Sequence, residues 1–298
     1  MSIRVNPNPA PDLLADIALN RQAEDTALQQ ISTGQSVNQL SDNPAAAAQV
    51  VLNHSATTQN TQYQANDSNL QTEEQTIDST VNSAVQAVTQ AISLGTEGAT
   101  GTLSDEDRQA IASEIQGIQN QILSLANLNY QGNYVFSGTA TSTQPFVLDS
   151  SQPDGVKYNG NTGVNSVQIA PQESIAVNRP GSQIFTNPSG DILGALNGLI
   201  TALQTNSGIA AANANLNTAF NELTTQQVFY GNALQQVQSA TTNLNNSKVQ
   251  LGTQENALVG ADLATSITNL EQASTATNAI LSATNQILTT LNLLDYLT

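Results

Sequence analysis

The sequence has 298 residues, of which only 10% are charged, and its 23 acidic and 6 basic residues give a net charge of −17. An ordinary soluble domain has about 25% charged residues. The basic residues are scattered, so no cationic patch is available to bind nucleic-acid phosphates or an anionic membrane. The absence of cysteine excludes disulfides, thiolate catalysis and cysteine-based zinc sites.

The length suggests about two domains. No run of about 18 apolar residues occurs, so we expect no membrane-spanning helix. The first 14 residues lack the basic region and apolar run of a cleavable signal peptide. The sequence therefore predicts either a cytoplasmic protein or one that is exported without signal cleavage.

The N-terminal segment predicts a helix followed by a connector. Three prolines between residues 7 and 11 predict no regular helix before Asp12. Apolar residues then recur at helical spacing from Leu13 to Ile31, and residues 34–43 form a connector. Asn43 followed by Pro44 fits a helix N-cap and the first helical position.

A long helix is predicted from Pro44 to about Thr96, and the glycines at 95, 98 and 101 are expected to break it. Its late part repeats apolar residues at intervals of seven: Leu70, Ile77, Ala84 and Ala91, joined by Val81 and Val88. Ser104 predicts the cap of a further helix, with Asp107 as its capping acid. The core face of that helix is Ile111, Ile115, Ile118, Ile122 and Leu125, and it should end near Gly132.

Between residues 133 and 190 the apolar period changes from helical to alternating. The candidate strands are Phe146–Leu148, Val156–Tyr158, Val167–Ile169 and Ile175–Val177. Glycine and proline between them supply turns. This segment is expected to be a small antiparallel β module that faces outward and is dispensable for the helices around it.

Helix is predicted again from Asp191 to Gly208 and from residue 209 to 259. The second stretch carries a strict seven-residue ladder, which is typical of a coiled-coil seam. We expect the seam to consist of Leu216, Leu223, Tyr230, Val237, Leu244, Leu251 and Leu258. The register slips at residues 259–262, and a last helical segment runs to the C-terminus.

These elements predict a mainly α protein with a small β insertion. Helices from both chain ends would form an elongated antiparallel rod, with the β module at its far end. The expected division is 1–43 and 260–298 for the two halves of an axial core, 44–132 and 191–259 for the rod, and 133–190 for the β domain.

Three segments resemble the flagellin superfamily. ISTGQSVNQLSDNPAAAAQV (residues 31–50) and the segment 261–297 resemble its two terminal motifs. The central NYQGNYVFSGTATSTQPF resembles the superfamily members that join the flagellar hook to the filament. The matching positions are Gly34, Asn38, Ser41, Asp42, Pro44, Tyr134, Phe136, Ser137, Gly138, Pro145 and Phe146. The chain departs from the family pattern at Ser36, where a basic residue is usual, and at Asn43, where an acid is usual.

The resemblance implies a structural protein of the bacterial flagellum, outside the cell, that joins the hook region to the filament. It also implies export through the flagellar type III apparatus without signal cleavage. The implied partners are the preceding hook-associated protein, filament flagellin, copies of the chain itself and a cytoplasmic export chaperone. The alternative within the superfamily is a filament-forming flagellin.

The C-terminal helix carries an apolar arc wider than a two-residue seam, and one N-terminal helix cannot cover it. We therefore expect this arc to bind other helices in an assembly, because several exposed large side chains would otherwise favour aggregation. The expected assembly residues are Leu263, Ile267, Leu270, Ile280, Leu281, Ile287, Leu288, Leu291 and Leu294.

No catalytic, cofactor or metal site is predicted, and an enzyme is the least favoured class. His54, the single histidine, has no suitable partner at helical spacing and is interpreted as a surface or groove residue. The acids at 105–107 are interpreted as a helix start, and Glu73 and Glu74 as a solvated face. Glycines 155, 160 and 163 are expected in hairpin turns, since no phosphate-loop sequence follows them.

Overall fold

A computed structural model describes residues 10–149, 151–152 and 154–294, with side chains of 10–12 and 287–294 outside the description. The chain divides into two compact units, residues 1–59 with 247–298 and residues 60–246. Both boundaries fall inside long helices, α2 (Pro44–Gly98) and α6 (Ile209–Val259). Within the described ranges, no helix combines the length and apolar character needed to cross a bilayer.

The first unit contains α1 (Ala10–Thr33) and α7 (Leu263–Leu294), which pack against each other. The prediction that no helix precedes Asp12 was wrong by two residues. Pro11 lies in the first turn of α1, where a backbone N–H has no helical acceptor to lose. The helix therefore tolerates a proline that would break it further along.

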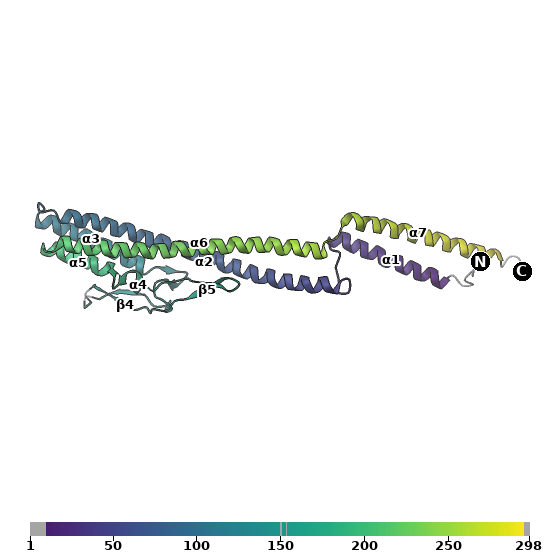
Figure 1. Ribbon diagram of the computed structural model, residues 1–298, viewed down its shortest axis with the longest axis horizontal. Helices are drawn as coiled ribbons and strands as arrows, with labels where there is room; N and C mark the ends of the chain where they lie inside the picture. The colour runs from purple at the N-terminus through teal and green to yellow at the C-terminus, as the bar shows by residue number, and fades with distance from the viewer. Residues whose placement is uncertain (1–9, 150, 153, 295–298) are drawn as a thin grey trace. The chain divides into compact units, whose positions relative to one another are not determined.

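The second unit is built on α2 and α6, which run antiparallel (Figure 1). Asn60 Nδ2 donates to the Leu244 carbonyl at 3.0 Å, whereas Asn213 Nδ2 donates to Thr96 Oγ1 at 3.0 Å. Residue numbers thus rise along one helix as they fall along the other. Two shorter helices, α3 (Asp105–Ala126) and α5 (Ile192–Thr205), pack with them around a continuous apolar core.

The capping signals in the sequence are confirmed. Ser104 and Asp107 form a reciprocal capping box at the start of α3, which satisfies two otherwise free N–H groups. Asn43 Oδ1 accepts from the Ala46 N–H at 3.1 Å at the start of α2. Asp191 caps α5 in the same way through the Gly194 N–H.

As predicted, α2 ends among its glycines, at Gly98, whereas Gly95 lies inside the last turns without breaking the helix. Both glycines allow neighbouring helices to approach closely. A Cβ on Gly95 would lie 2.6 Å from Asn213 Oδ1, and one on Gly98 would overlap the side chain of Leu203. Gly101, with open space around it, lies in the turn to α3.

The β region consists of four short antiparallel hairpins and one helical turn, α4 (Gly181–Ile184). The strands are β1 (Asn129–Tyr130), β2 (Asn133–Tyr134), β3 (Phe146–Leu148), β4 (Val156–Tyr158), β5 (Ser166–Ala170), β6 (Glu173–Ala176), β7 (Thr186–Asn187) and β8 (Gly190–Asp191). The predicted bounds of β3 and β4 are confirmed. The four two-residue strands were missed, since two residues carry no alternating pattern.

An aromatic cluster forms the centre of this region. The Phe136 and Phe185 rings meet edge to face with centroids 5.2 Å apart, and Phe146 lies 5.8 Å from Phe185 and 5.1 Å from Tyr158. The Tyr158 hydroxyl donates to the Phe136 carbonyl at 2.9 Å. The buried phenylalanines belong to the same apolar core as the four helices, so the region is not an independent module.

The β region lies along the flank of α2 and α6 rather than beyond their ends (Figure 1). Ile169 and Ile175 of the β5–β6 hairpin pack with Leu70 of α2 and Val237 of α6. The far end of this unit is formed by the turns at residues 99–104 and 206–208. The expectation of an outward-facing β module at the far end is therefore corrected, because its apolar side needs the helices as a partner.

Replacing residues 139–188 with a short linker should destabilise the second unit, in contrast to the dispensability expected from the sequence. The change removes Phe146 and Phe185 and exposes core side chains of α3 and α5 to water. We expect a lower helical circular-dichroism signal per helical residue and a lower urea midpoint. Leu148→Ser, at an exposed position of β3, is the control and should change neither. Unchanged helicity in the deletion variant would contradict this prediction.

Candidate functional site

The most deeply buried side chains between α1 and α7 are small or polar. Ala27 and Ala273 are buried there, and the buried Ser266 hydroxyl donates to Gln30 Oε1 at 3.1 Å. A groove of about 720 Å³ remains between the two helices, lined by residues such as Asn20 and Gln272. Small residues bury little apolar area, so this pair contributes little stability of its own.

Several larger apolar side chains of this helix pair are exposed rather than buried in the interface between the two helices. Leu263, Ile267 and Leu281 of α7 are 48%, 47% and 47% exposed. Leu270 and Ile280 are half-buried. On the described part of α1, the exposed large apolar residues are Leu14, Leu19 and Leu28. The side chains of the remaining predicted assembly residues, Ile287, Leu288, Leu291 and Leu294, lie outside the described residues.

The exposed α7 residues share one side of the helix. Successive residues turn by about 100°, which brings Leu263, Ile267, Leu270 and Leu281 within about 60° of one another. Ser266 and Ala273, which face α1, lie next to this stripe. The first unit thus presents a row of large apolar groups that it does not bury itself, and such a surface is typical of a protein-binding face.

The connector 34–43 is ordered by the family-motif residues. Gly34 adopts a φ of +70°, a left-handed conformation that suits glycine. The Asp42 carboxylate accepts from the N–H groups of Asn38 and Gln39 at 3.0 and 2.9 Å. Pro44 takes the first position of α2; Ser41 is exposed. This segment turns the chain from α1 into α2.

The connector also pairs with the end of α6 and with the link between α6 and α7. Ser36 donates from its N–H and its hydroxyl to the Val259 carbonyl, at 2.6 and 3.1 Å. The Ala261 N–H donates to the Gly34 carbonyl at 2.9 Å. The serine that replaces the usual basic residue is therefore a hydrogen-bonding residue here, and Asn43 supplies the helix cap that an acid would supply.

The central motif is structural. Phe136, Ser137 and Phe146 are fully buried, Pro145 is buried and Tyr134 is half-buried. The Ser137 hydroxyl donates to the Tyr134 carbonyl at 2.8 Å. Gly138 has a φ of +73°, and a Cβ there would overlap the Asn161 carbonyl. These residues shape the turn that carries the chain into the aromatic cluster.

The predicted seam of α6 is buried along most of its length. Five members of the ladder have exposures of 5% or less: Leu216, Leu223, Tyr230, Val237 and Leu244. The last two, Leu251 and Leu258, are half-buried.

Glu74 is not on a solvated face, and the interpretation from the sequence was wrong. Its side chain is 0% exposed, and burial, followed by the charges of Glu73 and Asp78, raises its pKa to about 8. The signal was present in the sequence, because Glu74 lies seven and fourteen residues before Val81 and Val88. Because glutamate is polar, the sequence did not predict that Glu74 belongs to the same buried seam.

His54 has a partner that its own helix did not predict. Its Nε2 lies 2.9 Å from Glu255 Oε1 of α6, and its side chain is 64% exposed. An exposed pair of this kind contributes at most about 1 kcal/mol. The description of His54 as a surface residue holds, with Glu255 added as its contact.

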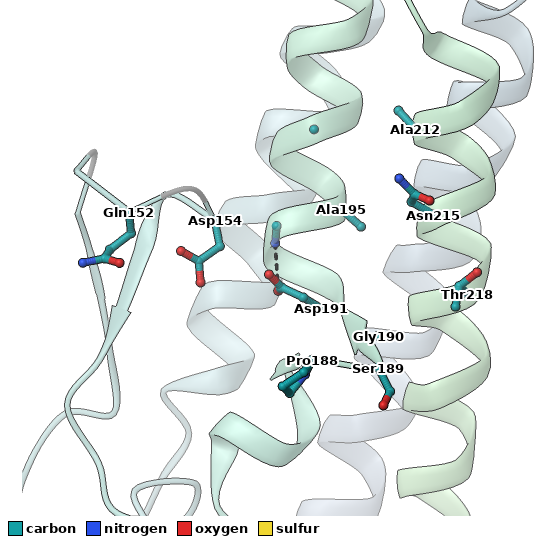
Figure 2. Close-up of a pocket in the computed structure, with 12 residues that line it drawn as sticks. Gln152, Asp154, Pro188, Ser189, Gly190, Asp191, Ala195, Ala212, Asn215 and Thr218 are labelled. Atoms are coloured by element: carbon teal, nitrogen blue, oxygen red, sulfur yellow. Dashed lines mark hydrogen bonds between the residues drawn. The ribbon is translucent and has the colours of Figure 1, made fainter.

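A further cavity, of about 670 Å³, lies in the second unit between α5, α6 and the loop before β4. Figure 2 shows Asp154 and Asp191 on one side of it and Asn215 and Thr218 on the other. The Asp191 carboxylate already accepts a hydrogen bond from the Gly194 N–H as the N-cap of α5, and burial raises its pKa. Among the described residues, no three histidine or acidic side chains cluster closely enough to hold a metal ion.

Comparison with known proteins agrees with this geometry. The model of the bacterial flagellin N-terminal helical region matches residues 7–141, and that of the flagellin C-terminal helical region matches residues 214–297. The chain belongs to the bacterial flagellin family. The flagellin matches cover α1 and α7 as well as the long helices of the second unit.

Within the flagellin family, the chain is similar to proteins named flagellar hook-associated protein 3. It is 29% identical to the Escherichia coli protein over 249 residues, which is 78% of this chain and 74% of the relative. It is 32% identical to the Salmonella typhimurium protein over 174 residues, 56% of this chain and 52% of the relative.

The fold is also that of a solved relative. The crystal structure of the flagellar junction protein FlgL from Legionella pneumophila matches with a TM-score of 0.63 and 16% identity, over 71% of this chain and 100% of that chain. This likeness shows the fold, a mainly helical chain with a central β region, and confirms the predicted fold class.

Proposed function

We propose that this chain is a structural junction protein of the bacterial flagellum, which joins the hook region to the filament through its terminal helices. The observation that carries the proposal is the α1–α7 pair. It buries alanine and serine between its helices and leaves Leu263, Ile267 and Leu281 half exposed. A folded chain gains by covering such a surface, and helices of neighbouring subunits have the matching shape and chemistry.

The similarity to hook-associated protein 3 favours the junction over the filament. The proposed neighbours are the preceding hook-associated protein, filament flagellin and further copies of the chain. Residues 1–43 and 260–298 would form the axial part, with residues 44–132 and 191–259 as rod and 133–190 as β domain. The role is mechanical and requires no catalytic or cofactor chemistry.

The proposed location is outside the cell, after export without signal cleavage through the flagellar type III apparatus. Before export, the apolar stripe of α7 would need a cover in the cytoplasm, since an exposed row of Leu and Ile favours aggregation. A chaperone that binds this helix fits that need.

The test is a strain in which only the gene for this chain is deleted. We expect hooks without filaments and flagellin monomers in the culture medium, and restoration of filaments when the chain is supplied again. A strain with hooks and normal filaments would refute the junction role. Loss of the filament subunit itself would instead identify the chain as a flagellin.

A further inference from the structure

The seam between α2 and α6 has two chemically different parts. Asn60 bonds to Leu244, and this antiparallel register, continued in steps of seven, places Asp67 opposite Val237 and Glu74 opposite Tyr230. The next steps of α2 are Val81 and Val88, which are fully buried. Three successive polar residues of α2 therefore occupy positions that are apolar in the next part of the same helix.

These polar side chains are buried with incomplete hydrogen bonding. Asn60, Asp67 and Glu74 are 5%, 0% and 0% exposed. Among the described residues, Asn60 Oδ1, Asp67 Oδ1 and both carboxylate oxygens of Glu74 have no partner. Asp67 Oδ2 accepts from the Thr241 hydroxyl at 3.2 Å. An ionised carboxylate without partners is strongly disfavoured in such a place.

The groups around Glu74 do not offer it a compensating charge. On its own helix the nearby ionisable groups are Glu73 and Asp78. From α6 it faces the buried, uncharged Tyr230, whose hydroxyl lies near the Arg179 backbone. Arg179, which follows β6 and lies near Tyr230, is engaged by Gln226 and by the Phe229 ring, whose centroid is 4.1 Å from the guanidinium carbon.

The β5–β6 hairpin covers this part of the seam. Ile169, Ile175 and Val177 pack on Leu70 and Val237, between the polar steps of α2. Asn66 Nδ2 donates to the Gln168 carbonyl at 3.4 Å, and the Glu173 carboxylate of β6 lies close enough to Asp67 to disfavour its ionisation. Opening of the seam here would release the hairpin as well.

We propose that Asn60, Asp67 and Glu74 make this part of the α2–α6 seam a proton-controlled clasp, closed while Glu74 holds its proton and loosened when the proton is lost. The apolar part of the seam, from Ile77 to Gly98, stays closed in both states. The clasp regulates the chain's conformation and is independent of its role at the junction.

The direction of the effect follows from proton linkage. Burial raises the pKa of Glu74 from 4.5 to about 8 in the closed state, so the closed state binds a proton that the open state releases. The closed state is therefore fully favoured below about pH 4.5, loses stability as the pH rises toward about 8, and changes little above it. Protonation of Asp67, whose pKa burial also raises, acts in the same direction.

Hydrogen exchange of the full chain measures this opening by segment. Between pH 5.5 and 7.5, the opening constant for amides in 60–76 and 230–244 should rise by roughly 50- to 100-fold, after correction for intrinsic exchange rates. The β5–β6 hairpin should follow them. Amides of α3 and α5 should change much less.

The comparison variant is Glu74→Gln, which keeps the shape of the protonated acid and cannot titrate. It should remove most of this pH dependence, and Glu74→Leu provides the same test with an apolar side chain. Glu97→Gln, an exposed position of α2, should behave as the unaltered chain. Equal pH dependence in Glu74→Gln, or an equal loss of protection in α3 and α5, would overturn the proposal.

Discussion

Leu223→Ala should lower the free energy of unfolding of the second unit by about 2–5 kcal/mol, the usual cost of truncating a buried leucine. Leu223 is fully buried in the ladder of α6 and, in the register fixed by Asn60 and Leu244, faces Val81. The four surrounding helices restrict how far the site can collapse, so a cavity would remain. Urea denaturation followed by circular dichroism measures the change.

Leu148→Ala is the matched control, since it makes the same change in the second unit at a side chain that is 69% exposed. Its effect should stay within about 0.5 kcal/mol. If both variants lost similar stability, or neither lost any, the seven-residue ladder would not be the stabilising seam of the protein.

Ile267→Asp should abolish filament attachment while leaving the isolated chain folded. Ile267 is 47% exposed in α7, so a charge there remains hydrated, and the free energy of unfolding should change by less than about 0.5 kcal/mol. In an assembled axis the same carboxylate would be buried without a partner, which strongly disfavours assembly. Cells that carry only this variant should release unpolymerised flagellin into the medium.

Thr268→Asp places the same charge one helical step, about 100°, away from the stripe. Thr268 is exposed and bonds only within its own helix, to the Ala264 carbonyl. This variant should support normal filaments. Normal filaments with Ile267→Asp would contradict the assembly role of the stripe, and loss of filaments with both variants would show that it is not specific to the stripe.

The elements that were predicted well are those that follow one local rule. The ladder of α6 gave its bounds at 209–259, and Ser104 with Asp107 marked the start of α3, because heptad spacing and capping act within a few residues. The residues that misled are those whose role depends on distant partners. Gly95 resembles a helix breaker in the sequence, but it lies inside α2 and leaves room for Asn213 of α6.

The position of the β region and the burial of Glu74 were missed for the same physical reason. A strand pattern predicts which side chains are buried but not which helix they pack against. The sequence around Ile169 therefore did not predict its contacts with Leu70 and Val237. The apolar stripe of α7 could be predicted from the sequence, because its apolar residues span a wider arc of the helix than one neighbouring helix can cover. The side chains from Ile287 onward lie outside the described residues, and their part in that stripe stays a prediction.

The most direct test of the junction role is to locate the chain on intact flagella by electron microscopy with a specific gold label. The label should form a single narrow band at the boundary between hook and filament, in cells whose filaments remain attached. Label distributed along the length of the filament would contradict the account and show that the chain is a filament subunit.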